Sequence, residues 1–493
     1  MKTLDLFIIF AYLIGIVLFG TWFGRKQKTT SAYFLGNRSV PWWAVAFSIV
    51  ATETSTITFI SVPGIAFARG GNFQFLQLVF GYLLGRIVIS LLFIPSYFRG
   101  ELLTVYQLLD RRFGGKIKML AASLFVVMRN IADGIRLLLT AIVLAAVYVS
   151  FQPSANTETI TIASIVLIGM AMIIFTYFGG MEAVIWVEVV QLGIYIAGAI
   201  AAAVILVTSI DGGLATANAL ATQAGKYSLF DFAFDHTKTF TFWSGLIGGC
   251  FLTMSTHGTD QYLVQRYLCT DRPRRAIIAL LTSGAIVLAQ FIGFLFIGVL
   301  LFAFYQPLGM SFERGDQVFP HFITNYMPSG LSGLVVAAIF AAAMSSSLNS
   351  IAATAVNDLY KPFKPGMNDN HYLKVSYLLT VVWGVVQIGV ALAVRGQARS
   401  ALDQALSVAS LINGPILGVF LVGTLLRRVS QPPALIGMIV SIGSMLYIFL
   451  ATKIAWTWYV FIGSLITMLV AWLASFAWQR EPQGIQRVEE ETT

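Results

Sequence analysis

Charged residues are scarce in this chain: Asp, Glu, Lys and Arg make up 11% of its 493 residues, against roughly 25% in soluble proteins. Hydrophobic residues make up 57%, and the mean hydropathy is +0.80. This composition excludes an ordinary soluble domain and is typical of a chain that crosses a membrane many times. The formal net charge of +9 does not indicate nucleic-acid binding, because it follows from where the basic residues sit between apolar stretches.

Cysteine is nearly absent, with only Cys250 and Cys269. The two lie 19 residues apart within or beside one expected helix, about 28 Å at the rise of an α-helix, so they cannot bridge to each other. A structural disulfide and a thiolate metal site are therefore not expected. The sequence also shows no nucleophile–base pair and no metal-ligand cluster, so we do not expect an enzyme.

Thirteen apolar stretches are long enough to span a bilayer, which takes roughly 20 residues. They lie at 4–23, 42–67, 74–97, 118–149, 160–178, 184–209, 243–265, 276–305, 331–355, 373–394, 404–426, 434–451 and 454–478. The first has the length of a signal peptide core but is followed by no cleavage box, so we expect it to be a transmembrane helix. The whole chain then forms one all-α, polytopic membrane domain with a short polar tail.

The basic residues are distributed unevenly between the two sides of these stretches. Counting alternate connections and the tail, 20 of the 31 Lys and Arg residues fall on one side and eight on the other. Positive charge is retained on the cytoplasmic side. We therefore expect the N-terminus outside, the C-terminus in the cytoplasm, and a plasma-membrane location, which in bacteria is the inner membrane.

The stretch 51–61, ATETSTITFIS, is polar at membrane depth. Oxygen-bearing side chains occupy six of the seven positions 52–58, at Thr52, Glu53, Thr54, Ser55, Thr56 and Thr58. Polar groups at this depth usually face a cavity, a partner or an ion, and oxygen ligands suit a small hard cation or a hydroxyl-bearing solute. The alternative is a Ser/Thr-rich helix that packs closely on a neighbour.

A second interrupted helix follows five helices later, at 243–265, where Ser255 to Gln261 read STHGTDQ. Five intervening helices give the two interruptions opposite orientations, which is typical of transporters built from inverted repeats. The alternative is that Gly245, Gly248 and Gly249 only permit close helix packing.

Two further features point to the same interior. Ala342, Ser345 and Ser346 are spaced i, i+3 and i+4, so one helix face presents a carbonyl and two hydroxyls. In 411–415, LINGP, the Asn-Gly-Pro run is expected to break a helix.

Three ionisable residues are also expected inside the membrane. Glu188 needs a cation, an arginine or a proton as its partner. Arg86 and Arg136 are placed to pair with Glu53, Asp133 or Glu188, or to bind an anionic substrate.

Four separated motifs resemble the sodium:solute symporter family. They are STITFISVPG (55–64), GGMEAVIWVEVVQ (179–191), GTDQYLVQRYL (258–268) and AAAMSSSLNS (341–350). The resemblance implies an inverted-repeat core of five plus five helices like that of LeuT. The helix at 4–23 would precede this core, 42–209 and 243–426 would be the repeats, helices within 434–478 would follow, and 479–493 would be the cytoplasmic tail.

The resemblance also implies site residues. The sodium ligands would be Ala51, Thr54, Ala342, Ser345 and Ser346, and the substrate-binding residues Ser55, Thr58, Phe73 and Gln77, and more loosely Thr256 and Asn413. Two departures from the family pattern leave a second sodium site open: Val187-Glu188 replaces a Thr-Asp pair, and the motif at 341–350 is about three residues shorter than usual. Glu188 and Glu53 remain candidates for a second cation or for coupling.

We therefore expect a sodium-coupled secondary active symporter that imports a small polar organic solute by alternating access. Proton coupling, passive transport and a transporter-like sensor are the alternatives. Na⁺ is the expected co-transported ion, and the expected partners are the solute and membrane lipid, with no nucleic acid and no obligate protein partner. The solute itself, whether sugar, sialic acid, monocarboxylate, amino acid or inorganic anion, is left open.

Overall fold

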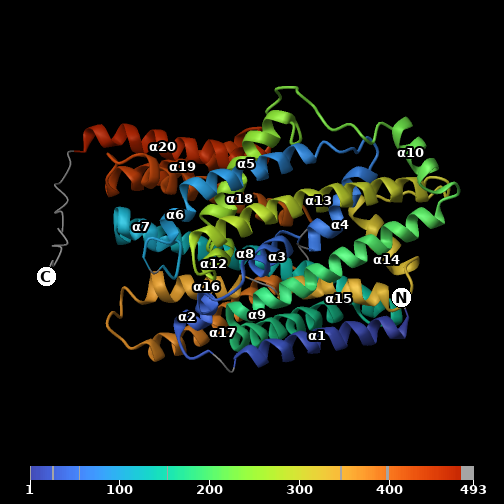
Figure 1. Ribbon diagram of the computed structural model, residues 1–493, viewed down its shortest axis with the longest axis horizontal. Helices are drawn as coiled ribbons and strands as arrows, with labels where there is room; N and C mark the ends of the chain where they lie inside the picture. The colour runs from blue at the N-terminus through green and yellow to red at the C-terminus, as the bar shows by residue number, and fades with distance from the viewer. Residues whose placement is uncertain are drawn as a thin grey trace.

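A computed structural model describes residues 2–24, 27–54, 56–100, 102–152, 154–344, 347–395 and 399–478, without the side chains of 23, 24, 56, 57, 150, 342–344 and 399–410. Helices run roughly along its long axis (Figure 1). The helix α1 begins at the right-hand end, which we call the α10 end, and α20 finishes at the left-hand end, which we call the α7 end.

The helices are these, in chain order. The first half contains α1 (Thr3–Gly24), α2 (Thr30–Leu35), η1 (Gly36–Arg38), α3 (Trp42–Glu53), α4 (Thr56–Phe67), α5 (Leu76–Leu92), α6 (Ile94–Tyr97), α7 (Tyr106–Phe113), α8 (Gly115–Phe151), α9 (Thr157–Ser209), α10 (Gly213–Gln223), η2 (Ser244–Gly248) and α11 (Gly249–Gly258). The second half contains α12 (Gln261–Leu268), α13 (Pro273–Tyr305), η3 (Gly315–Gln317), α14 (Val318–Asn325), α15 (Leu331–Met344), α16 (Leu348–Thr354), η4 (Ala355–Tyr360), α17 (Asp369–Val394), α18 (Arg399–Leu425), α19 (Gln431–Ala451), η5 (Trp456–Trp458) and α20 (Tyr459–Ala477).

Each expected apolar stretch is helical over most of its length. Within the described residues, seven helices are long and apolar enough to span a membrane, or eight if the bent pair α3–α4 counts as one crossing. The count of thirteen crossings therefore stays a prediction. The all-helical, polytopic architecture is confirmed.

The helix α9 covers two of the expected stretches. Its 53 residues correspond to about 80 Å of helix at 1.5 Å per residue, more than twice the roughly 30 Å of a bilayer's hydrocarbon core. Gly180, with φ 57° and ψ −163°, kinks it. A Cβ there would stand 2.6 Å from Gln27 Nε2 and 2.7 Å from the Tyr33 carbonyl oxygen, so only glycine fits.

Both expected interruptions are present. The axes of α3 and α4 differ by 59° across the break after Glu53, and α11 stops at Gly258 before α12 starts at Gln261. The third expected break is wrong: α18 runs through Asn413, Gly414 and Pro415 without ending. Proline's ring removes one backbone hydrogen bond, and a membrane helix often continues past it.

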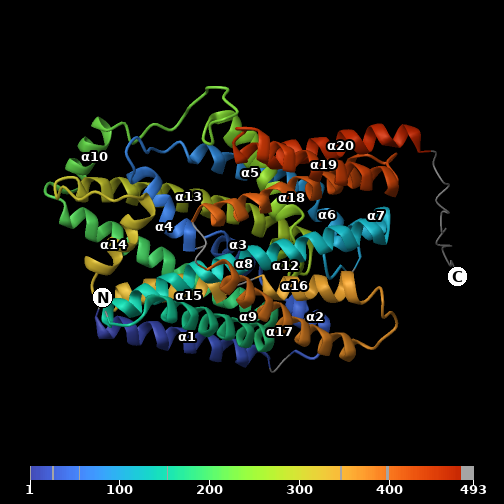
Figure 2. The same cartoon turned by 180° about the vertical axis from the view of Figure 1, so that it is seen from behind.

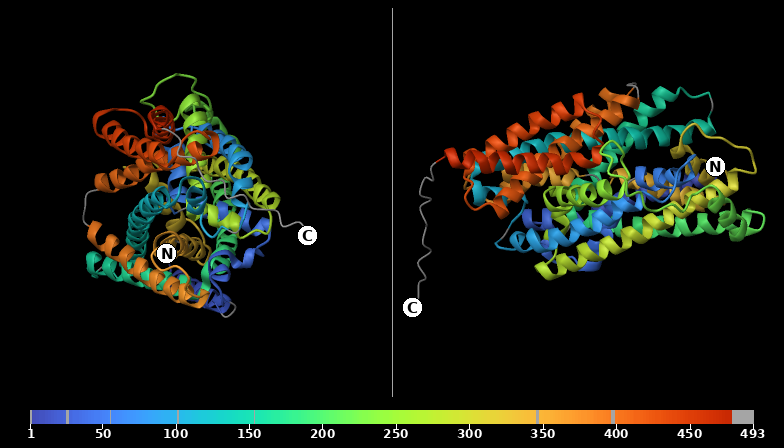
Figure 3. Two further views of the ribbon diagram at one scale, coloured as in Figure 1. Left: turned by 90° about the vertical axis from the view of Figure 1, so that its left-hand side faces the viewer. Right: turned by 90° about the horizontal axis from the view of Figure 1, so that it is seen from above.

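The bundle has distinct edges. Seen from its α7 end (Figure 3, left), α19 and α20 lie at one edge and α1 at the other. The helix α1 packs on α9 and α15, while α19 and α20 pack on each other and on α18. The helices with interruptions lie between these edges (Figure 1). Cys250 and Cys269 are free and buried, as expected.

Glycine permits close contact where α11 and η2 meet α5. A Cβ on Gly245 would stand 2.6 Å from the Gln77 backbone, and one on Gly249 would stand 2.5 Å from the Leu78 carbonyl oxygen. The glycines of this segment therefore serve packing, in addition to the break that follows at Gly258.

Candidate functional site

The break between α3 and α4 exposes the carboxyl end of α3. The last carbonyls of a helix lack intrahelical partners, and Ala51 lies in this last turn. Thr54 follows with φ −80° and ψ 65°, outside helical geometry. Both residues are buried, so main-chain oxygens are available in the interior at the position expected for sodium.

The Thr54 hydroxyl is already used. It donates to the Val50 carbonyl oxygen at 2.7 Å and accepts from Gln290 Nε2 of α13 at 2.8 Å. Thr54 is therefore left with its carbonyl for an ion, which is the role that the resemblance implies. Gln290 was missed from the sequence, where it is a lone amide in the apolar stretch 276–305.

The other half of the expected sodium site falls in the sequence around the end of α15 at Met344 and before the start of α16 at Leu348. Ala342 belongs to α15, although its side chain is not described, and Ser345 and Ser346 lie outside the described residues. The next residue, Ser347, donates from its amide to Asp133 Oδ2 of α8 at 3.0 Å, and its hydroxyl also donates to this oxygen.

Glu53, next to the break, is shared between an arginine and a histidine. Arg86 Nη2 of α5 lies 2.5 Å from Glu53 Oε2, and His257 Nε2 of α11 lies 2.8 Å from Glu53 Oε1. Both partners are buried. The expected pairing of Arg86 with Glu53 is confirmed, and the contact between His257 and Glu53 joins the first interrupted helix to the second.

Glu188 is neutralised by Arg266. Both side chains are fully buried, and Arg266 bridges the carboxylate through Nη2 at 2.5 Å and Nε at 3.2 Å. Thr52 Oγ1 donates to the same carboxylate at 3.0 Å, and Ser48 Oγ donates as well. Glu188 thus has an arginine as its partner, one of the three kinds of partner expected for it. Arg266 lies one residue beyond the expected apolar stretch 243–265, so its position in the sequence does not indicate that it is buried.

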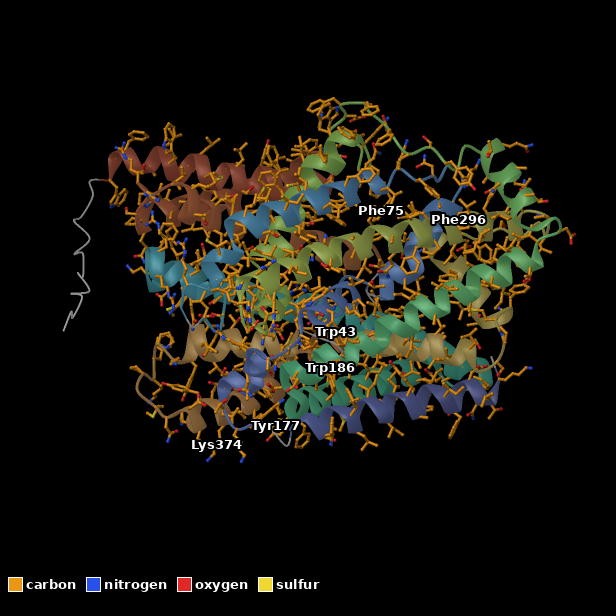
Figure 4. All side chains as sticks on the ribbon, in the orientation of Figure 1. Trp43, Phe75, Tyr177, Trp186, Phe296 and Lys374 are labelled. Atoms are coloured by element: carbon orange, nitrogen blue, oxygen red, sulfur yellow. The ribbon has the colours of Figure 1, made fainter. Side chains whose placement is uncertain are left out.

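Two tryptophan rings pack α3 against α9 near the ion pair of Glu188 and Arg266. Trp43 and Trp186 lie together near the middle of the molecule (Figure 4), with ring centroids 5.5 Å apart and planes at 71°. Edge-to-face packing of this kind adds about 0.5–1.5 kcal/mol beyond burial. The first interrupted helix is therefore anchored up to its break.

The expected substrate residues fall into two groups. Thr58 Oγ1 donates to the Glu53 carbonyl across the break at 3.1 Å, while Thr256 Oγ1 donates to the Leu252 carbonyl at 3.1 Å. Asn413 accepts from Ser255 through its main-chain oxygen at 3.1 Å. These residues line the two interruptions. Ser55 lies outside the described residues.

Phe73 and Gln77 form the other group, at the start of α5. Gln77 is buried and accepts from the Asp231 amide at 3.0 Å, and the ring of Phe73 packs edge-on against Tyr227, centroids 5.6 Å apart. Both are covered by the connection 224–243 in this conformation. Phe75, labelled in Figure 4, marks this region, which lies on the α10 side of the middle of the molecule.

Arg136 of α8 is the least closely paired interior arginine. Among the carboxylates whose side chains the structure describes, its nearest is that of Asp133, at 3.6 Å, and the Arg136 side chain is 23% exposed. Arg86, Arg129 and Arg266 each have a close carboxylate partner.

A family model describes most of this chain. Residues 33–441 match the sodium:solute symporter family. The sodium/sialic acid symporter NanT of Aliivibrio fischeri is 32% identical over 96% of this chain and 93% of its own length. SiaT of Proteus mirabilis, also a sodium/sialic acid symporter, is 30% identical over 94% of this chain and 92% of its own length. The human sodium-coupled monocarboxylate transporter 1 is 26% identical over 91% of this chain and 73% of its own length.

Solved structures share the fold. A substrate-bound, outward-open Na⁺-coupled sialic acid symporter has a TM-score of 0.85 at 28% identity, covering 97% of this chain and 98% of its own. Mhp1, a nucleobase-cation symporter, has a TM-score of 0.59 at 14% identity and 90% and 93% coverage, which concerns the fold alone.

Proposed function

The chain belongs to the sodium:solute symporter family, and from this premise we propose that its solute is an acidic, hydroxyl-rich sugar of the sialic acid type. Sodium-coupled symport is common to its relatives, which are transporters and not enzymes.

Arg136 carries this proposal. Guanidinium binds carboxylate through two parallel hydrogen bonds, and Arg136 is partly exposed, with its nearest carboxylate 3.6 Å away. The other interior arginines, Arg86, Arg129 and Arg266, are closely paired. Two relatives at 30% identity or above carry sialic acid in their names, and sialic acid contains one carboxylate and several hydroxyls.

We propose that the sodium ion binds between the carboxyl end of α3 and the carboxyl end of α15. The ligands would be the carbonyls of Ala51, Thr54 and Ala342 and the hydroxyls of Ser345 and Ser346. The oxygens available at the carboxyl end of α3 support this set. Each sodium ion that enters down a 100 mV potential provides about 2.3 kcal/mol, which drives solute accumulation.

The topology is proposed as thirteen crossings with the N-terminus outside. The repeats would be 42–209 and 243–426, and their first helices are the ones interrupted in α3–α4 and α11–α12. Ser55, Thr58, Thr256 and Asn413 would face the solute between them. Phe73 and Gln77 would join when the connection 224–243 moves off the start of α5.

The test is uptake into proteoliposomes with inward sodium, proton or no gradient. The panel would hold N-acetylneuraminate, its C1 amide, lactate, galactose and proline. We expect sodium-dependent uptake of N-acetylneuraminate and little of the amide. Arg136→Gln should raise the half-saturating N-acetylneuraminate concentration by roughly 10- to 100-fold, since a charge-assisted pair contributes about 1.5–3 kcal/mol. Arg274→Gln, an exposed arginine, is the control for lost charge. Equal uptake of acid and amide would reject the acidic solute.

A further inference from the structure

The junction of α8, α16 and α17 contains buried polar atoms that lack hydrogen bonds. Figure 2 shows these three helices next to one another. Asp133 of α8 is 3% exposed. Its Oδ2 accepts from Ser347, but its Oδ1 accepts from no described group and has only the Arg136 Nη1 at 3.6 Å.

Gln387 of α17 is the second residue at this junction whose buried polar atoms lack hydrogen bonds. It is fully buried, and neither its Oε1 nor its Nε2 has a hydrogen-bond partner. Its main-chain oxygen lies 3.0 Å from where a Cβ on Gly134 would stand. One turn earlier on the same buried stripe, a Cβ on Gly384 would stand 3.5 Å from Leu348 Cδ2. Gln387 is therefore enclosed between α8 and the start of α16.

Asn130 is the third member. It lies one turn before Asp133 on the same face of α8, is 3% exposed, and has an unpartnered Oδ1. Its Nδ2 donates to the Val126 carbonyl at 2.7 Å, which leaves the oxygen as the free end.

Such atoms are expensive to bury. A buried polar group without a partner costs about 1–3 kcal/mol. Three such side chains at one junction therefore indicate that a ligand binds there. The available atoms are mainly oxygens, with one formal negative charge from Asp133. Oxygen donors suit a small hard cation, and a single carboxylate fits a monovalent ion better than a divalent one.

We propose that Asp133, Ser347, Asn130 and Gln387 form a second sodium site, which fills as the solute binds. This inference rests on the proposed acidic solute. Without solute, Arg136 balances the charge of Asp133. When the solute carboxylate draws Arg136 away, Asp133 loses that cation, and sodium replaces it. Charge is conserved: one Arg⁺–Asp⁻ pair becomes one Arg⁺–solute⁻ pair and one Na⁺–Asp⁻ pair.

This exchange couples the two ligands. If solute binding raises the affinity of this site for sodium, sodium binding raises the affinity for the solute by the same factor. The site differs from Glu188, which Arg266 already neutralises. It also uses the residue that directly follows the shortened serine motif, Ser347.

The test is the sodium-to-solute stoichiometry, measured in proteoliposomes from the membrane potential at which net solute flux is zero. We expect two sodium ions per solute for the unaltered protein and one for Asp133→Asn. Asp110→Asn is the matched control, because Asp110 pairs with Lys118 and is 38% exposed. An unchanged stoichiometry in Asp133→Asn would overturn the site.

Gln387→Met is an independent test of the second sodium site, and it remains available if Asp133→Asn fails to fold. If Gln387 is only an unsatisfied amide, methionine should raise the melting temperature and leave the sodium dependence unchanged, which would overturn the proposal. If Gln387 binds sodium, the half-saturating sodium concentration should rise on the order of tenfold, the equivalent of one lost contact.

These outcomes are separable from those of the solute proposal. The stoichiometry is measured with whichever solute the uptake panel identifies. A neutral solute would remove the exchange step through Arg136, whereas the loss of one sodium ion in Asp133→Asn would still support the cation site.

Discussion

Glu53 lies between Arg86 at 2.5 Å and His257 at 2.8 Å, one residue before Thr54. A carboxylate with two such partners already has its charge compensated. The sequence left Glu53 open as a coupling group, and this geometry favours a structural role. Removing one partner from a buried pair costs about 3–5 kcal/mol, because the other charge stays buried alone.

Glu53→Gln should therefore destabilise the fold and lower the melting temperature, while any protein that reaches the membrane keeps its sodium dependence. Adding Arg86→Met removes the stranded guanidinium and should recover most of the lost stability. The measurements are thermal unfolding in detergent and sodium titration of uptake. A stable Glu53→Gln variant whose uptake no longer responds to sodium would show instead that Glu53 couples the ion.

Ser345 and Ser346 lie outside the described residues, so their role is tested by substitution. If they bind sodium, Ser345→Ala and Ser346→Ala should each raise the half-saturating sodium concentration by roughly 5- to 100-fold, from a loss of about 1–3 kcal/mol. Solute affinity at saturating sodium should change much less.

The matched control is Ser376→Ala, a buried serine of α17 whose hydroxyl donates to the Tyr372 carbonyl. If both test variants behave like this control, the serines serve helix packing, where alanine is equally small.

At the scale of elements, glycine determines where helices turn and meet. Gly180 adopts φ 57° between the halves of α9, which both contribute to the interior. Gly193 lies farther along the same helix, and a Cβ there would meet nothing within 4 Å. The two positions give opposite expectations for one substitution.

Gly180→Ala should destabilise the protein, because the new Cβ would meet Gln27 and the Tyr33 backbone in a conformation that alanine rarely adopts. Gly193→Ala should be neutral or stabilising by about 0.5–1 kcal/mol. Melting temperatures of both variants check this. A Gly180→Ala variant as stable as the unaltered protein would mean that the kink does not depend on glycine.

At the scale of the whole molecule, the two ends of the bundle have to lie on opposite sides of the membrane. In Figure 4, Lys374 lies near the α7 end, while α1 begins at the α10 end. The distribution of Lys and Arg predicts that the α7 end faces the cytoplasm.

In a background with Cys250→Ala and Cys269→Ala, a membrane-impermeant thiol reagent should label Thr3→Cys from outside. Arg274→Cys and Lys374→Cys should be labelled only after the membrane is opened. Labelling of Thr3→Cys and Arg274→Cys from the same side would reject the odd number of crossings.

The sequence determined the class of the fold and the position of its interruptions. Long apolar stretches can satisfy their backbone in a bilayer only as helices, and polar runs within them mark where a helix gives way, as at 51–61 and 255–261. The resemblance to the family was also visible in the sequence, because each of its motifs is a short run of consecutive residues.

Only the tertiary structure decided which charges meet. Arg266 and Glu188 are 78 residues apart in the chain. Many other pairs of opposite charge are also far apart in the sequence and would have been equally plausible, because pairing depends on which helices become neighbours. The same holds for Asp133, whose contact with Ser347 spans 214 residues. A lone buried amide such as Gln387 looks like any polar residue in an apolar helix. That it lacks a partner follows only from the packing of three helices around it.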